Sequence, residues 1–232
     1  SDVLTQSAPK MLLAVGMLVV IIAGGMDMTV GRLAGLGAVV SGTLAQQSTY
    51  YIKFWPSLPE MPLIVPIVVS IIIGIISGVI TGLIISKLKV PAFLAGLGLQ
   101  LIIYGGNLLF MKKAPNNSQP LAGFKESFTK FGTGSVAGVN YLIIVAFVVM
   151  IAVYIILNMT TLGKNIYATG GNREAAKVAG INVFKIDMFV YILSGALAAL
   201  AGCMLAARTG SANATYAEGY EMDAIASCII GG

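Results

Sequence analysis

The 232-residue chain lacks histidine and is poor in cysteine and in charged residues. Without histidine, neither a Ser–His nor a Cys–His catalytic pair can form, and two cysteines do not make a typical metal site or disulfide framework. The phosphate-binding pattern G-x-x-x-x-G-K-[ST] is also missing, so we expect no ATP hydrolysis by this chain. No segment interleaves clustered Lys and Arg with aromatic residues, as nucleic-acid binders do. These absences predict a chain with no catalytic residue, metal, bound cofactor or nucleic-acid partner.

Apolar residues dominate what is present. Hydrophobic residues make up 57% of the chain and charged residues 10%, against about 25% charged in soluble domains. A helix needs about 20 apolar residues to cross a bilayer. Charge-free runs of that length lie at residues 61–86, at 90–111, at 131–163 with its apolar part at 141–157, and at 188–207. We therefore predict an all-α, polytopic membrane protein, in which Cys203 and Cys228 are small buried apolar residues.

The first apolar region has a different form. Residues 11–26 and 33–46 are each short for a crossing, and they flank the sequence GGMDMTVGR. This pattern predicts a broken or hairpin-like helix pair whose irregular centre is shielded by protein or lines a cavity. Asp27 in that centre has two readings. It stabilises the interruption, by pairing with Arg32 or by accepting backbone N–H groups at the start of a half-helix, or it contacts substrate directly.

Two further polar groups are candidate sites. Gln100, Tyr104 and Asn107 recur at helical spacing, which places them on one face of a helix. They either bond neighbouring helices or line a path for a hydrophilic solute. An acidic cluster is expected in the loop before the apolar run that begins at residue 224, and it is either a solvated edge or a contact for a soluble donor protein outside. Its members are Glu218, Glu221 and Asp223.

Glycines are spaced for close helix packing. Gly74, Gly78 and Gly82 form a tandem G-x-x-x-G series, and Gly31 and Gly35 form another. Small residues at that spacing let two helix backbones approach closely.

The polar segment 163–185 contains one short helix. Asn172 is suited to cap its start, Glu174 lies in its first turn, and Gly180 is suited to end it. The expected helix, residues 173–179, is only about 10 Å long. A helix that short is not stable alone in water. The segment therefore predicts a small docking element that a membrane protein presents to a soluble partner.

Charge alone does not orient the chain in the membrane. With the segment 163–185 in the cytoplasm, cations are divided equally between the two sides, so the positive-inside rule does not decide. The cytoplasmic set is Lys87, Lys89, Lys164, Arg173, Lys177 and Lys185. The outer set is Lys53, Lys112, Lys113, Lys125, Lys130 and Arg208.

Four segments carry a resemblance to a known family. They read GGMDMTVGRLAGLGAVVSG, GKNIYATGGNREAAKVAGINV, FVYILSGALAALAG and ARTGSANATYAEGYEMDAIASCIIGG. In this order they resemble the permease subunits of bacterial carbohydrate ABC importers. Within that family the galactose and methyl-galactoside permeases are the most similar, and ribose and xylose permeases share most of the same motifs.

The resemblance implies a function and a set of partners. A dimer of permeases in the bacterial inner membrane makes the path for a monosaccharide, and an extracytoplasmic binding protein delivers the sugar. A cytoplasmic ATP-binding subunit holds ATP and Mg and drives transport. It contacts the coupling helix, whose family pattern matches Glu174, Ala175, Ala176 and Gly180, and this places the segment 163–185 in the cytoplasm.

Two alternatives stay open at this point: a nucleoside importer permease, and a channel or receptor with no ATPase partner. The chain is expected to be a single transmembrane domain over residues 1–232. Because it opens at Ser1 without Met and ends at Gly231–Gly232 within an apolar run, both ends are expected to be truncated.

Overall fold

A computed structural model describes residues 2–113 and 115–231, and these residues fold as the predicted all-α protein. Ser1 and Gly232, on which the expectation about the chain ends partly rests, lie outside the described residues. Within the described ranges, five helices are long and apolar enough to cross a membrane. They are α1 (Asp2–Ile22), α3 (Ile64–Lys87), α4 (Ala92–Met111), α6 (Tyr141–Met159) and α9 (Val183–Thr209).

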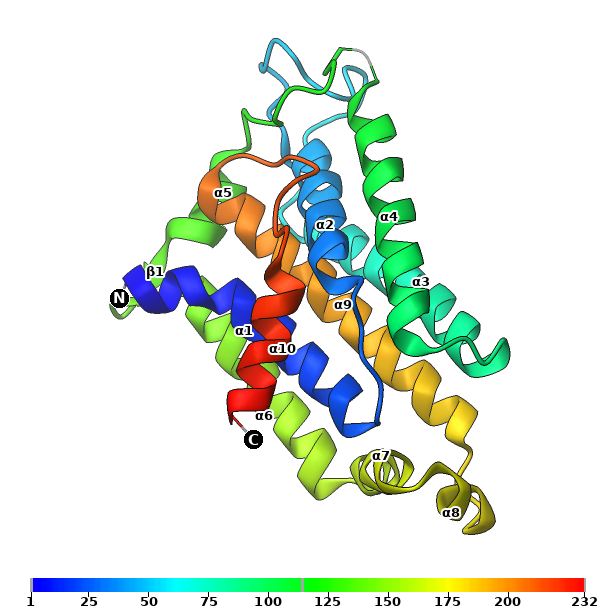
Figure 1. Cartoon of the computed structure of the whole chain (residues 1–232). Helices are drawn as coiled ribbons and strands as arrows, with labels where there is room; N and C mark the ends of the chain where they lie inside the picture. Colours follow the sequence, from blue (N-terminus) through cyan, green and yellow to red (C-terminus); the bar gives the residue numbers. More distant parts are fainter. Residues whose placement is uncertain (1, 114, 232) are drawn as a thin grey trace.

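Helix α9 is the centre of the packing. It runs diagonally through the molecule, with α1 and α2 (Val30–Ala45) on one side and α3 on another (Figure 1). The predicted glycine series explains the close contact with α3. A Cβ added at Gly74 or Gly78 would collide with the backbone of Gly195 or Tyr191 in α9. The two helices therefore touch backbone to backbone along this seam.

The second glycine pair has a different neighbour. A Cβ at Gly31 would meet the Ala217 carbonyl at 2.8 Å, and one at Gly35 would meet the Tyr216 carbonyl at 2.8 Å. Both carbonyls belong to the segment that joins α9 to α10 (Tyr220–Gly231). At Gly31 and Gly35, therefore, the close neighbour of α2 is the irregular backbone of this segment and not another helix.

The expected break near the start of the chain is present, but its first arm is longer than predicted. Instead of a short run over residues 11–26, α1 has 21 residues and includes the polar first turns and Pro9. Those residues interrupt the apolar run in the sequence without ending the helix. The chain turns after Ile22 with Gly24 at φ +79° and stays irregular until α2 begins at Val30. This segment returns from the end of α1 toward the middle of the molecule (Figure 1).

Each end of the helix bundle carries an element that the sequence did not indicate. After α4 come helix α5 (Glu126–Thr133) and a small hairpin of strands β1 (Ser135–Val136) and β2 (Val139–Asn140). At the other end, the segment 163–185 was expected to hold one helix. It contributes to α7 (Thr161–Gly171) and contains all of α8 (Arg173–Val178). The Thr160 side chain caps α7 by accepting the Gly163 N–H. Thr160 is therefore a helix-start signal that sequence reasoning overlooked because the segment is polar.

The structure bears on the expected grouping of cations. Lys89 lines the same pocket as Arg173 and Lys177. The ammonium group of Lys113 lies over the ring of Trp55, 4.4 Å from its centroid, in the loops at the opposite end. These cations therefore divide between the two ends as expected from the sequence.

Replacing one glycine at the α3–α9 seam tests how far the thermal stability of the protein depends on the close approach of the two helix backbones. In Gly78→Ala, the new Cβ would lie 2.7 Å from the Ile192 Cα. Alanine favours a helix over glycine by about 1 kcal/mol, yet we expect Gly78→Ala to lower the melting temperature of the detergent-solubilised protein. The matched control is Gly98→Ala in α4, where nothing lies within 4 Å of the added Cβ. Equal melting temperatures for the two variants would contradict the close-approach explanation.

Candidate docking helix and transport site

The start of α8 has the predicted cap. Asn172 is in an extended conformation, and its side-chain Oδ1 accepts the N–H groups of Glu174 and Ala175, each at 3.0 Å. These bonds satisfy two donors that an isolated helix start leaves free. The Glu174 side chain in the first turn adds a negative charge at the positive end of the helix.

The end of α8 also follows the prediction, although the helix is one residue shorter than expected, because Ala179 is the cap. Gly180 has φ +83°, a left-handed conformation that glycine adopts without strain. Its N–H bonds the Lys177 carbonyl, and the Ile181 N–H bonds the Ala176 carbonyl, both at 3.0 Å. This pair of bonds is the Schellman arrangement, which closes a helix sharply.

Helix α8 has an exposed surface and is held to the bundle at two residues. The first is Ala176, which is buried, whereas Glu174 and Ala175 are exposed. A 2.6 Å ion pair joins Lys177 to Glu174, and the hydrogen bond from Lys177 lowers the pKa of that carboxyl, which is therefore ionised at neutral pH. The second such residue is Arg173, whose guanidinium pairs at 2.5 Å with the buried carboxylate of Asp187 in α9.

A pocket of about 570 Å³ lies beside this ion pair. Its lining joins α8 to the start of α9, to the end of α3 and to the turn at Gly24 and Gly25. The pocket is polar on the α8 side, where Lys89 and Lys177 contribute cations. Helix α8, the start of α9 and the turn that follows α1 therefore meet at one place.

Asp27 holds the interruption between α1 and α2, but not by the ion pair that the sequence suggested. Its Oδ1 accepts the Thr29 N–H at 3.0 Å and the Thr29 hydroxyl at 2.6 Å. Its Oδ2 accepts the Ser194 hydroxyl of α9 at 2.8 Å. The expected pairing with Arg32 is wrong, because Arg32 bonds Glu218 instead. The alternative, a carboxylate accepting a backbone N–H next to a helix start, is what the structure has.

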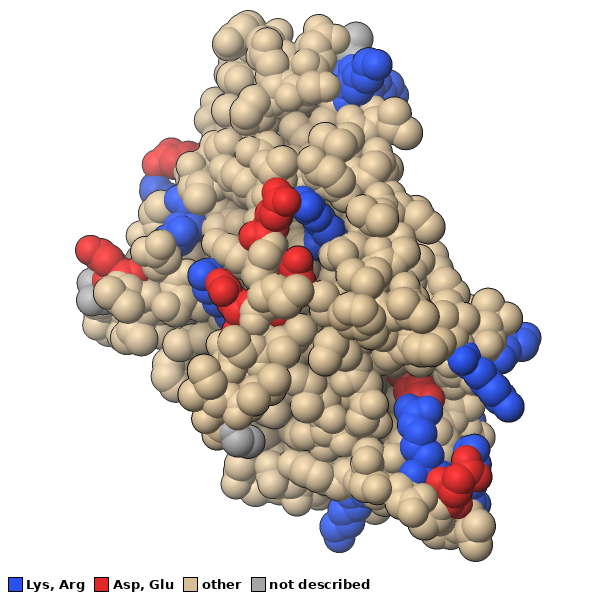
Figure 2. Space-filling model, viewed as in Figure 1, with Lys and Arg blue, Asp and Glu red and all other residues tan. Residues whose placement is uncertain are grey.

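The acidic cluster is paired with cations of other helices. Lys10 of α1 bonds Asp223 at 2.7 Å, and Arg32 of α2 bonds Glu218 at 2.8 Å. Glu221 is only 9% exposed. The sequence suggested a loop for this cluster, but Glu221 and Asp223 lie in the first turn of α10. Figure 2 shows acidic and basic side chains interleaved on the middle of this face.

The predicted polar stripe is divided between two environments. Tyr104 of α4 lies under the Arg32 guanidinium, which is 4.1 Å from the ring centroid. Asn107 is 1% exposed, and neither polar atom of its amide has a hydrogen-bond partner among the described residues. Gln100 is half-buried. The structure therefore joins Tyr104 to the charged cluster and leaves Asn107 as a buried amide with unused bonding capacity.

Sequence reasoning missed three residues that these contacts require. Lys10 and Asp187 are ionisable residues inside helices of membrane-spanning length, and that placement is itself a signal of function or pairing. Ser194 gave no such signal, because one hydroxyl in a small-residue helix is common.

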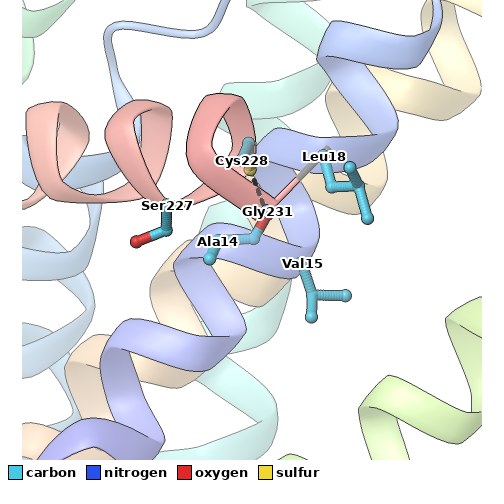
Figure 3. A pocket seen from close by; sticks show the side chains of 6 residues that line it. All are labelled: Ala14, Val15, Leu18, Ser227, Cys228 and Gly231. Atoms are coloured by element: carbon cyan, nitrogen blue, oxygen red, sulfur yellow. Dashed lines mark hydrogen bonds between the residues drawn. The ribbon is translucent and has the colours of Figure 1, made fainter.

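A smaller pocket of about 230 Å³ lies between α1 and α10 (Figure 3). It is lined by Ala14, Val15, Leu18, Ser227, Cys228 and Gly231. The Cys228 thiol donates to the Ala14 carbonyl at 3.2 Å, and Cys228 is half-buried, whereas Cys203 is fully buried. The lining is mainly apolar, so this pocket belongs to the packing of α10 on α1 and offers a hydroxyl-rich solute little to bond.

Comparison with known proteins identifies relatives along the whole chain. A family model described as the permease component of the branched-chain amino acid transport system matches residues 1–232. The chain is 39% identical to the galactose/methyl galactoside import permease protein MglC of Escherichia coli K12, over all of this chain and 70% of that protein. It is 37% identical to the protein of the same name from Haemophilus influenzae, with the same coverage. It is 36% identical to the E. coli K12 ribose import permease protein RbsC, over all of this chain and 68% of that protein. No solved structure matches the chain.

Removing the Asp27 carboxylate should destabilise the fold. Asp27→Ala leaves two hydroxyls and one N–H without their acceptor in a buried site, at a cost of about 1–3 kcal/mol for each unsatisfied group. We expect a lower folded yield and a lower free energy of unfolding in detergent, with a smaller loss for Ser194→Ala. A variant of Asp27→Ala with unchanged stability and altered substrate affinity would instead show that Asp27 is a substrate contact.

Proposed function

This chain belongs to the family described as the permease component of the branched-chain amino acid transport system, and on that premise we propose that it forms the sugar path of an ATP-driven importer. The cargo is a monosaccharide, galactose or a methyl galactoside. The named relatives support a sugar over an amino acid, because those reported above are import permeases for galactose/methyl galactoside and for ribose. The protein acts as a multi-pass subunit of a bacterial inner membrane.

The observation that carries this proposal is α8. A six-residue helix with an Asn172 cap and a Gly180 end is exposed at one end of the bundle. It is too short to be stable alone, and it is held by Ala176 and by the Arg173–Asp187 ion pair. A rigidly mounted, exposed helix is suited to a groove on a cytoplasmic ATP-binding subunit. That subunit holds ATP and Mg, and this chain contributes transport and no ATP hydrolysis.

The other partners follow from the arrangement of the two ends. The loops at the end opposite α8 face away from the cytoplasm and meet an extracytoplasmic sugar-binding protein. They are tied together by the antiparallel bridge between Gln46 and Phe124, so they present one surface. A second copy of the chain completes the sugar path.

Straining the end of α8 tests the coupling assignment. In Gly180→Val, a β-branched residue must take φ +83°, which costs about 1–3 kcal/mol. We expect an uptake rate about tenfold lower in proteoliposomes that also contain the ATP-binding subunit and the loaded sugar-binding protein. ATP hydrolysis should then no longer respond to the loaded binding protein.

The control is Gly171→Val, on the same segment. Gly171 does not have a positive φ, and nothing lies within 4 Å of an added Cβ. Gly171→Val should keep most of the uptake. Normal uptake and normal ATPase stimulation in Gly180→Val would disprove the assignment of α8 as the coupling helix.

A further inference from the structure

Five ionisable residues gather on one face formed by α1, α2 and α10, and we call them the central charged cluster: Lys10, Arg32, Glu218, Glu221 and Asp223. Several remain open to the surroundings. The side chains of Lys10, Asp223 and Glu218 are 43%, 54% and 59% exposed. This degree of exposure calls for an explanation, because Lys10 lies in a helix long and apolar enough to cross a membrane, and Arg32, the partner of Glu218, lies in a shorter apolar helix.

The cluster lies near the middle of the bundle. At about 1.5 Å per residue, Lys10 is about 12 Å from the start of α1 and about 18 Å from its end. Arg32 is about 20 Å along α2 from Ala45, where the chain leaves the bundle. The ion pairs place Asp223 and Glu218 at the same depths. These distances are shorter than the hydrocarbon thickness of a membrane, about 30 Å, so the cluster lies along the length of the spans and not at their ends.

Other faces of the molecule have the opposite character. Helices α4 and α6 carry no charged residue, and α3 carries a charge only at its last residue, Lys87. Their exposed side chains include Ile76, Ile80, Leu101, Ile102, Val148 and Ile151. Faces of this apolar character are suited to contact with lipid chains. Exposed charges at the same depth would be costly in lipid, so the face of the central charged cluster is turned away from it.

The chemistry of the cluster favours a neutral, hydroxyl-rich solute. Two cations and three carboxylates nearly balance, so the cluster has little net charge with which to capture an ion. Arg32 presents its guanidinium over the Tyr104 ring, and its Nη1 has no partner among the described residues. The Oε2 of Glu221 also lacks one, but both atoms are buried, so the groups open to a solute are the side chains of Lys10, Glu218 and Asp223. These exposed donors and acceptors can replace the water bonds that a sugar gives up.

We propose that the central charged cluster lines the water-filled path of the importer, and that its exposed side chains, Lys10, Glu218 and Asp223, contact the monosaccharide as it passes. This inference rests on the proposed function. It also assigns Glu218 and Asp223 a different role from contact with a soluble donor protein, because they lie about half a membrane below the outer end of the bundle. The cluster acts through weak, exchangeable hydrogen bonds, which suits passage better than retention.

Accessibility to a water-soluble reagent tests the location. In a background of Cys203→Ala and Cys228→Ala, Ala226→Cys places a thiol beside the Lys10–Asp223 pair. The control is Ile102→Cys, at a lipid-facing position of α4 that is 70% exposed. In proteoliposomes, a membrane-impermeant charged methanethiosulfonate should react with Ala226→Cys and leave Ile102→Cys unmodified.

Two results would overturn the location. One is equal protection of both thiols from the reagent. The other is spontaneous cross-linking of two chains through Ala226→Cys without any reaction with the reagent, which would make this face a contact between copies. Neither result depends on which cargo is carried, so the labelling experiment tests the location of the cluster separately from the proposed function. If the unsubstituted importer takes up no galactose, only the proposed function is contradicted.

Uptake kinetics test the solute contacts. Glu218→Gln removes the charge that holds Arg32, and we expect about tenfold slower galactose uptake while ATP hydrolysis still responds to the loaded binding protein. Glu218→Asp is the matched comparison, because it keeps the charge that pairs with Arg32, and it should recover part of the lost rate. If Glu218→Gln instead weakens binding of the sugar-binding protein to the permease, Glu218 is a docking contact and the proposal fails.

Discussion

A stretch of non-helical backbone inside a membrane-spanning protein must have every polar group satisfied by protein, and this constraint governs the structure around Asp27. The chain leaves α1 at Ile22 and does not re-enter a helix until Val30. Asp27 supplies acceptors on both sides, to Thr29 within the interruption and to Ser194 of α9. The small residues of α9 and α3 then allow the surrounding helices to close around it.

The same constraint recurs at the other end of the chain. After α9 the backbone returns irregularly to α10, and it lies directly on the glycine face of α2. The carboxylate of Glu221 is placed against Gly31, in the first turn of α2, where a helix start favours a negative charge. Two interrupted segments therefore stabilise each other, and the charges that they bring together form the polar face of the bundle.

Features that depend on neighbours in sequence could be predicted. Asn172 and Gly180 define α8 through bonds that span a few residues, and the sequence predicted both. Arg32 could not be assigned its partner in the same way, because Glu218 is 186 residues away, and the nearby Asp27 was the only candidate that local reasoning offered. The first helix was shortened in the prediction because Pro9 and Lys10 break its apolar run, yet Lys10 finds Asp223 across the fold.

Helix α9 carries two polar clamps on nearby turns. Asp187 pairs with Arg173 of α8, and Ser194, seven residues along, bonds Asp27. Between them, Gly78 of α3 packs against the backbone of Tyr191 and Ile192 in α9. Two turns of α9 therefore anchor both α8 and the interruption around Asp27, so neither segment can shift relative to α9 without breaking one of these contacts.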